Sequence, residues 1–472
     1  MNLTFLGAAR VVTGSMYLLT LDDGYNILVD CGLNYEKNIA REENANFPFD
    51  PYDIDLVVLT HAHVDHSGNI PTLFAKGYEG KVLCTEPTWR LADILLMDSA
   101  KIENARVSKA NRSRNRKGKQ AHKKESEAFR LFGQKQVMDA VGSMITLEFN
   151  TTFQLRHNVS VTLIPAGHIL GAASVVFEIT EGKKTKRLGF TGDLGKSNAK
   201  IIVPPQIPTK LDYLVMEGTY GDRIHQETRT PEDVLEEYIE RVCVENKGRL
   251  VIPAFSVGRT QAILFTINKL MRDGRIPSVK VFTDSPLGIK SGNIHQEFKH
   301  FLNDEAQSFV QEHHDLFLFK ELYIVEDQDD ETFVSNQNHP CIIVSSAGML
   351  EGGRIQRHIA NNIQNQNSTI LMAGFCTPGT LGHTLLSGAK NVAIKGRSYL
   401  VFADIQKTDA FSAHPDQTEL LKYFDEVQAN SNLKKVFVSH GEEASLLTMK
   451  DKISERGVQT VVPVIGETFE LN

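Results

Sequence analysis

The alternation of apolar and polar positions divides the chain into β-rich ends and a middle part of different character. Apolar stretches of strand length occur at 15–21, 25–30, 54–60, 81–85, 161–164, 173–179 and 187–190. Asp22-Asp23-Gly24, between the first two, is typical of a hairpin turn. The stretch 54–60 ends abruptly in the polar residues 61–68. The first part therefore predicts a β-rich domain that carries polar loops at the ends of buried strands.

In the middle part, predicted strands alternate with predicted helices. Helical patterns occur at 231–246, 257–272, 287–314 and 350–363, and apolar strand patterns at 249–253, 279–283, 341–345 and 369–373. Strands separated by helices at this spacing indicate βαβ units around a parallel sheet. After this part, strands are predicted again at 391–394, 398–405 and 436–439.

The chain has 472 residues, which is too long for one ordinary hydrophobic core. We therefore expect two domains, one inserted in the other. Residues 1–211 and 395–472 would form the β-rich domain, and residues 212–394 the inserted α/β domain.

Composition excludes some classes of protein. The net charge of −7 does not indicate a general polyanion binder, so attraction for a polyanion would have to come from bound metal or a local patch. The five cysteines form no C-x-x-C pair and are expected to be buried and reduced. No stretch approaches about 18 consecutive apolar residues, and the first residues do not resemble a signal peptide. We expect no membrane span and a cytoplasmic location.

One segment, 101–124, departs sharply from this composition. Its only acidic residue is Glu103, and its basic residues are Lys101, Arg106, Lys109, Arg112, Arg114, Arg116, Lys117, Lys119, Lys123 and Lys124. Charge runs are most often solvated helices or surface loops. The same run is also suited to attract the phosphates of a nucleic acid. The sequence leaves both interpretations open.

A candidate metal site follows the predicted strand 54–60. His61-Ala62-His63-Val64-Asp65-His66 places four groups that bind zinc within six residues. So dense a set favours a metal site over isolated structural histidines. His61 and His63 are two residues apart and can point the same way from an extended turn. Asp65 and His66 can then face a second ion.

Further candidate ligands stand at the ends of other predicted strands. His168 follows 161–164, Asp193 follows 187–190, and His440 follows the strand at 436–439. Each of these residues taken alone could equally be a structural polar residue or a metal ligand. Together they complete two coordination shells. Asp30 ends another apolar run, and we interpret it as a residue that orients a ligand imidazole.

These motifs resemble those of a known family. Asp30, the block 61–66, His168, Asp193 and His440 resemble, in order, the motifs of the metallo-β-lactamase superfamily. Glu217, His414 and His440, in their local sequences, resemble motifs of its β-CASP branch, which includes the mRNA 3′-end cleavage endonuclease and bacterial and archaeal ribonucleases. Further matches lie at 253–261, 284–287, 345–350 and 379–382. The resemblance implies an α/β fold: an αββα sandwich with an inserted α/β (β-CASP) domain containing a mainly parallel sheet.

The resemblance also implies roles for individual residues. His61, His63 and His168 would bind one zinc ion, Asp65, His66 and His440 a second, and Asp193 both. A hydroxide activated by the two metals would hydrolyse RNA phosphodiester bonds, leaving 5′-phosphate and 3′-hydroxyl ends. Asp65 is expected to be essential for catalysis. His414 would protonate the leaving oxygen, and Glu217 would orient His414. Both could also be ordinary polar residues of the protein surface. Manganese is an alternative metal.

Candidate contacts with the phosphates of the substrate lie in the middle part. Helix N-termini bind anions through free N–H groups, which suits the short turns before the helices expected from 350 and after 380. Two roles are equally compatible with the sequence for Arg259 and Arg354: contact with a phosphate, or an ion pair that stabilises the fold. The candidates are Arg259, Ser345, Ser346, Gly348, Arg354 and Thr380.

Other functions are weighed against the ribonuclease hypothesis. A thioesterase or lactonase on the same fold would have little use for a large inserted domain. DNA-directed relatives tend to carry an apolar residue where His440 stands. A non-catalytic RNA-binding scaffold would have lost ligand motifs that are all present here. The balance of endonuclease and 5′→3′ exonuclease action stays open, as does a homodimer.

Overall fold

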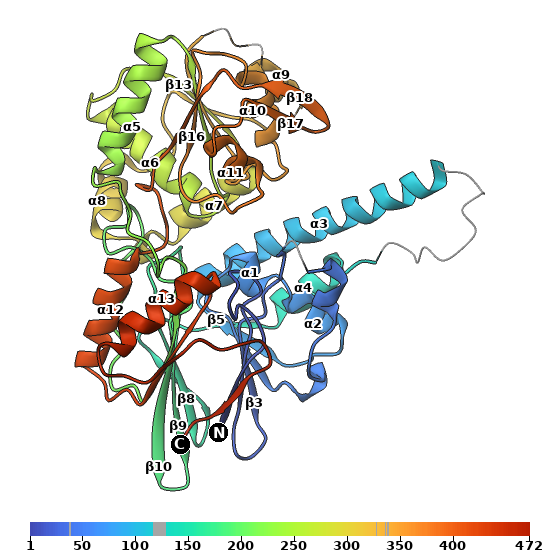
Figure 1. Cartoon of the computed structure of the whole chain (residues 1–472), viewed down its shortest axis with the longest axis vertical. Coiled ribbons are helices and arrows are strands. Elements are labelled where there is room, and N and C mark those ends of the chain that lie inside the picture. Colours follow the sequence, from blue (N-terminus) through green and yellow to red (C-terminus); the bar gives the residue numbers. More distant parts are fainter. Residues whose placement is uncertain (37–38, 117–128, 327, 336, 338) are drawn as a thin grey trace. The chain divides into compact units, whose positions relative to one another are not determined.

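The computed structural model describes residues 1–36, 39–116, 129–326, 328–335, 337 and 339–472. The chain divides into two compact units (Figure 1). The first unit contains residues 1–197, 204–224 and 414–472, and the second contains 198–203 and 225–413. The second unit is therefore inserted into the first along the sequence.

Two sheets form the centre of the first unit. One contains, in spatial order, β22 (Thr468–Glu470), β1 (Asn2–Phe5), β2 (Tyr17–Thr20), β3 (Asn26–Val29), β4 (Leu56–Val58), β5 (Lys81–Cys84) and β6 (Met144–Thr146). The other contains β21 (Thr460–Val461), β20 (Lys435–Ser439), β11 (Tyr213–Glu217), β10 (Lys184–Phe190), β9 (Ala173–Glu181), β8 (Val159–Pro165) and β7 (Thr152–Arg156). In each sheet, antiparallel pairs (β1 to β3, β7 to β10) are followed by parallel ones.

The two sheets share one apolar core. Leu3, Leu19 and Ile27 of the first sheet are buried in it together with Val175 and Phe177 of the second. Successive residues of a strand point to opposite faces, so each strand gives alternate side chains to this core. Burying a side chain of this size contributes about 1.5–3 kcal/mol, and the core thus fixes the register of both sheets.

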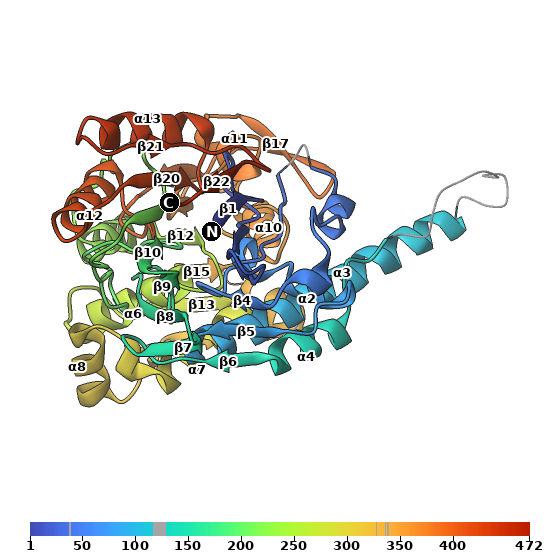
Figure 2. The ribbon, with the colours of Figure 1, turned by 90° about the horizontal axis from the view of Figure 1, so that it is seen from below.

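Helices cover the outer face of each sheet of the first unit, and Figure 2 shows the whole chain from below. On the second sheet, Leu420 and Phe424 of α12 (Gln417–Ala429) and Leu446 of α13 (Glu443–Ser454) pack with Val436 and Val438. On the first sheet, Leu56 and Val58 enter the shared core, so the buried Val57 between them faces the helical side. The helices there are α1 (Val64–Ser67), α2 (Ile70–Ala75), α3 (Glu86–Arg116) and α4 (Gln134–Gly142), with short 3-10 turns at Arg41–Ala45 and Pro51–Asp53. The αββα sandwich is confirmed.

The second unit contains a parallel sheet. Its order is β14 (Leu322–Ile324), β13 (Lys280–Asp284), β15 (Cys341–Ser345), β12 (Arg249–Pro253), β16 (Thr369–Met372) and β19 (Asp404–Lys407). Each neighbouring pair is parallel. The burial of all five positions of β15 is typical of a strand covered on both faces. This confirms the predicted α/β sheet.

Helices and a hairpin complete the second unit. The helices are α5 (Pro231–Ile239), continued by a π-helical turn at Glu240–Glu245, α6 (Arg259–Arg272), α7 (Pro286–Glu297), α8 (Asp304–His313), α9 (Gln328–Ser335), α10 (Ile355–Asn362) and α11 (Leu381–Leu386), with a 3-10 turn at Lys299–Phe301. The hairpin is formed by β17 (Asn391–Ile394) and β18 (Arg397–Leu400). Across the described ranges, no helix is both long and apolar enough to cross a bilayer.

Some predicted elements differ from the observed ones. The strand predicted at 398–405 is two strands, β18 and β19, and β19 pairs with β16 of the second unit. β11 pairs with β10 and β20 of the first unit, so the observed units meet at 224/225 and 413/414, against the expected 211/212 and 394/395. The helix predicted at 350–363 begins only at Ile355, because Leu350, Gly352 and Gly353 have positive φ angles of 65°, 75° and 71°.

Candidate metal centre

The candidate ligands lie on loops at the ends of strands in the first unit. His61 and His63 follow β4, and Asp65 and His66 stand on the short helix α1. The remaining three follow strands of the other sheet: His168 after β8, Asp193 after β10 and His440 after β20. The structure brings these seven side chains, which come from four separate parts of the sequence, to one place.

The backbone at this place has unusual conformations. Asp30 and His440 have φ angles of 59° and 56°, a region that residues other than glycine rarely adopt. Gly192, next to Asp193, has a φ of 56°, and a Cβ atom there would lie 2.9 Å from Cβ of Thr60. Such strain is held only where the surrounding structure determines it, and it occurs frequently at functional sites.

The first cluster contains His61, His63, His168 and Asp193. Nδ1 of His63 lies 3.2 Å from Nε2 of His61 and 3.1 Å from Nε2 of His168. Oδ2 of Asp193 lies 3.6 Å from Nε2 of both His61 and His168. One candidate ligand atom from each residue therefore converges on a common point, all within 4.8 Å of one another.

The second cluster contains Asp65, His66 and His440. The Nε2 atoms of His66 and His440 are 3.3 Å apart, and Oδ2 of Asp65 lies 3.7 Å from Nε2 of His440. Oδ1 of Asp193 lies 3.2 Å from Nε2 of His66 and 3.4 Å from Nδ1 of His440. Asp193 thus turns one carboxylate oxygen toward each cluster.

These distances suit zinc. In a tetrahedral site with zinc–nitrogen bonds of about 2.0–2.1 Å, neighbouring ligand nitrogens are about 3.3 Å apart. The nitrogen–nitrogen distances here are 3.1, 3.2 and 3.3 Å. Converging lone pairs repel one another unless a cation or a shared proton lies between them. The donor set therefore fits two divalent ions, one in each cluster, with Asp193 shared.

The electrostatics of the first cluster also fit a metal site. Burial lowers the pKa of His61, His63 and His168, and neighbouring imidazoles lower it further, despite the opposite effect of Asp193. The pKa of His63 falls to about 4. Neutral imidazole is the form that binds metal, so these three side chains are ready for coordination at neutral pH.

The carboxylates of the site are ionised. Burial opposes the ionisation of Asp65, but the nearby His440 and His66 lower its pKa to about 2. Burial likewise opposes ionisation of Asp193, and His440, His66 and His61 bring its pKa well below the usual value. Two negative charges held among imidazoles are a favourable environment for cations.

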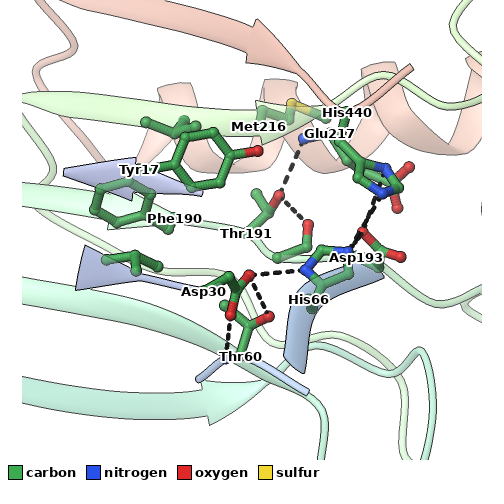
Figure 3. A pocket seen from close by; sticks show the side chains of 13 residues that line it. Tyr17, Asp30, Thr60, His66, Phe190, Thr191, Asp193, Met216, Glu217 and His440 are labelled. Atoms are coloured by element: carbon green, nitrogen blue, oxygen red, sulfur yellow. Dashed lines mark hydrogen bonds and ion pairs between the residues drawn. The ribbon is translucent and has the colours of Figure 1, made fainter. Parts of the chain in front are cut away.

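Hydrogen bonds fix the orientation of several imidazole rings. Nδ1 of His66 lies 2.7 Å from Oδ2 of Asp30, which also accepts a hydrogen bond from the Thr60 hydroxyl at 2.9 Å. Thr60 Oγ1 lies 3.1 Å from Nδ1 of His61, and Thr219 Oγ1 lies 3.1 Å from Nδ1 of His440. Figure 3 shows Asp30 joined to Thr60 and His66, while His66, Asp193 and His440 point toward one another. Such outer contacts set the tautomer and direction of a metal ligand.

The sequence did not indicate the two threonines of these contacts. Thr60 directly precedes His61, and Thr219 follows Glu217 by two residues, so a search for hydroxyls near all candidate site residues would have found both. Figure 3 also shows the rings of Tyr17 and Phe190, which line the small cavity behind His66 and His440.

Glu217 and His414 form a pair next to the first cluster. Nδ1 of His414 lies 3.2 Å from Oε1 of Glu217, whose side chain is buried. Oε1 of Glu217 also accepts a hydrogen bond from the Leu194 amide at 2.6 Å. The ring of His414 lies 4.5 Å from that of His168. Burial alone would lower the pKa of His414, but Glu217, Asp193 and Asp65 raise it above its ordinary value.

The candidate phosphate contacts lie in the second unit, and several have partners there. Arg354 donates to Oδ1 of Asp284 at 2.7 Å and to two carbonyls. The Ser345 hydroxyl donates to the carbonyl of Asp284 at 2.9 Å. Thr380 caps α11, accepting from the His383 amide at 3.2 Å, as its sequence context suggested. These three side chains are engaged within the unit itself.

Arg259, Ser346 and Gly348 lie differently. The guanidinium of Arg259 stacks 4.8 Å above the ring of Phe255, which is 38% exposed. A Cβ atom at Gly348 would lie 3.3 Å from Nη1 of Arg259. The hydroxyl of Ser346 accepts from Ser285 at 3.3 Å. α10 begins only at Ile355, so its N-terminus does not adjoin Ser345, Ser346 and Gly348. The predicted helix N-terminus beside these three residues was therefore wrong.

Three family models match the chain. The metallo-β-lactamase superfamily matches residues 9–235, the β-CASP domain residues 260–385, and the Zn-dependent metallo-hydrolase RNA specificity domain residues 399–463. The chain belongs to the metallo-β-lactamase superfamily and, within it, to the β-CASP branch. It is a metal-dependent hydrolase.

Similar proteins come from bacteria and archaea. The chain is 31% identical to "Ribonuclease TTHA0252" of Thermus thermophilus, covering 99% of both proteins. It is 29% identical to "Transcription termination factor FttA" of Methanocaldococcus jannaschii, over 98% of this chain and 70% of that one. It is also 28% identical to an "RNase J-like protein" of the same archaeon, over 93% of both chains.

Proposed function

We propose that the protein is a zinc-dependent ribonuclease that hydrolyses RNA phosphodiester bonds, mainly as an endonuclease with additional 5′→3′ exonuclease action. The proposal is supported by the family, by relatives named ribonuclease and RNase J-like, and by the match to an RNA specificity domain. Its substrate and principal partner is RNA.

One observation carries the proposal: Asp193 faces two separate ligand clusters, with one carboxylate oxygen turned to each. In the proposed site, His61, His63 and His168 hold one ion, Asp65, His66 and His440 hold the second, and Asp193 holds both. Asp30 orients His66 through their 2.7 Å contact. Two zinc ions held by these residues would supply a hydroxide at neutral pH and would neutralise charge on a phosphate.

The protein's own groups complete the reaction. His414, protonated because Glu217 raises its pKa, donates a proton to the departing 3′ oxygen. Glu217 holds the ring in place and compensates its charge. Cleavage then leaves a 3′-hydroxyl on one product and a 5′-phosphate on the other. Among the phosphate candidates, Arg259 with Ser346 and Gly348 remain as proposed contacts, and Arg354, Ser345 and Thr380 are proposed to support the second unit.

The test compares wild type with Asp65→Ala, using Asp53→Ala, an exposed carboxylate of the same unit, as the matched control. Each protein is incubated with 5′-labelled and internally labelled RNA, and with DNA of the same sequence. Wild type and Asp53→Ala are expected to cut RNA in preference to DNA and to contain two zinc ions, measured by mass spectrometry. Asp65→Ala is expected to lose cleavage while keeping its circular dichroism spectrum. Equal cutting by Asp65→Ala and wild type would refute the proposal.

A further inference from the structure

Helix α3 begins beside the candidate metal centre. The hydroxyls of Thr85 and Thr88 donate to the carbonyl of Gly171 at 2.7 and 2.9 Å, and Gly171 belongs to the loop that carries His168. Helix α3 then continues to Arg116. At 1.5 Å per residue, Lys101 stands about 20 Å from Thr88 along the helix, and Arg112 about 36 Å. The helix is thus a rigid link from the metal centre to a distant surface.

The middle of α3 is anchored, and the charge of its buried acidic residue is neutralised there. Glu103 is fully buried and pairs with Arg41 and, at 3.2 Å, with Arg106. Arg106 also donates to the carbonyl of Phe129. Because Glu103 is the one acidic residue between 101 and 116, the exposed part of the helix keeps only positive charge.

The later part of α3 carries no apolar face. Residues 108–112 are exposed at every successive position, and Figure 1 shows the helix extending beyond α2 and α4. A helix that is polar all round lacks packing to stabilise it and is expected to have another role. At 100° per residue, Lys101, Lys109 and Arg112 fall within about 80° of one another on the helix circumference. Within the described ranges, these three make no ion pair.

We propose that Lys101, Lys109 and Arg112 form a basic stripe that binds the sugar–phosphate backbone of the RNA away from the site of cleavage. The inference rests on the proposed ribonuclease function. A row of cations that have no ion-pair partner among the described residues, in a chain of net charge −7, complements a polyanion. The three cations lie along one line of the helix, as phosphates lie along a strand. Backbone contacts position a nucleic acid without reading its sequence, so the stripe orients RNA of any sequence relative to the metal centre. The basic residues Lys117, Lys119, Lys123 and Lys124 lie outside the described residues and form no part of the stripe.

The experiment measures RNA binding without cleavage. In an Asp65→Ala background, Lys109→Gln/Arg112→Gln is compared with Lys183→Gln/Lys184→Gln, which removes two exposed charges from the β9–β10 hairpin of the same unit. The dissociation constant for a fluorescent single-stranded RNA of 24 nucleotides is measured from 50 to 300 mM KCl. Each lost phosphate contact flattens the plot of log K against log salt by about 0.7 for a single strand.

The stripe variant is expected to flatten this slope by about 1.4 and to weaken binding several-fold at low salt, while the hairpin variant keeps the parent slope. Identical slopes in both variants would overturn the inference. The inference would also be overturned if the parent protein sedimented as a dimer and the stripe variant as a monomer. The stripe would then bind a second copy of the chain. The binding readout is independent of catalysis, so failure of the ribonuclease proposal shows separately as absent cleavage by wild type.

Discussion

Burial changes what histidine can do at this centre. His61 and His168, deep among other imidazoles, lose the tendency to take up a proton, whereas His414 gains it from Glu217. In the proposed mechanism, one type of side chain therefore serves as a metal ligand at His168 and as a proton donor at His414, whose ring lies 4.5 Å away. The difference is set by which charge lies nearest, as expected when pairs of titratable groups are pushed apart in pKa.

This difference predicts a pH profile. A general acid must be protonated, so kcat is expected to fall as pH rises through the pKa of His414, which lies above the ordinary 6.5. Glu217→Gln removes the charge that raises this pKa, so the descending limb is expected to move to lower pH. His414→Ala is expected to lower kcat by about 10²–10⁴-fold and to abolish the limb. Timed RNA-cleavage assays between pH 5.5 and 9 measure kcat and the position of the descending limb in each variant. A limb at the same pH in Glu217→Gln would contradict this assignment.

At the scale of elements, a buried carboxylate joins β13 to α10. Asp284, at the end of β13, is fully buried and accepts from Arg354 and His358 at 2.7 Å each. The sequence marked Arg354 as a phosphate candidate or an ion pair, and could not decide, because Asp284 lies 70 positions away. The start of α10 was predicted wrongly for a different reason. Two glycines with positive φ angles delay the helix, and the sequence does not show which φ angle a glycine will adopt.

Removal of this carboxylate is expected to destabilise the second unit. Asp284→Ala leaves His358 buried without its acceptor and Arg354 without its main partner, and breaking a buried pair on one side costs about 3–5 kcal/mol. Thermal unfolding measures the loss of stability, and hydrogen exchange at β13 and α10 shows where it occurs. Asp273→Ala, at an exposed position after α6, is the control and is expected to change little. Equal stability of the two variants would show that the pair is not structural.

At the scale of the whole molecule, the sequence predicted the layers and the ligand motifs but not the limits of the units. Ligands such as His168 and Asp193 were recognisable because each ends an apolar strand, a local pattern. Membership of β11 or β19 in a sheet depends on which strand lies beside it, which hydrophobic patterning does not encode. Long-range partners such as Thr60 with Asp30 were hidden for the same reason.

Metal removal is expected to act on one unit. Chelation leaves converging nitrogens and two carboxylates without a cation. The first unit should therefore lose about 4 kcal/mol of stability for each ion removed, relative to zinc at a thousand times its dissociation constant. Hydrogen exchange is expected to rise in 61–68, 166–171 and 439–441, while the parallel sheet of the second unit keeps its protection. Zinc added back should restore both. Uniform loss of protection across the two units would contradict this separation.

The insertion of one unit within the other has a consequence for biosynthesis. Asp193 and the ligands before it are made first, but His440 follows the inserted unit, and its strand β20 must pair with β11. A ribosome that has translated only as far as the inserted unit therefore carries a nascent chain whose second cluster still lacks His440. Under the proposed ribonuclease function, the protein would therefore acquire its activity only late in its own translation.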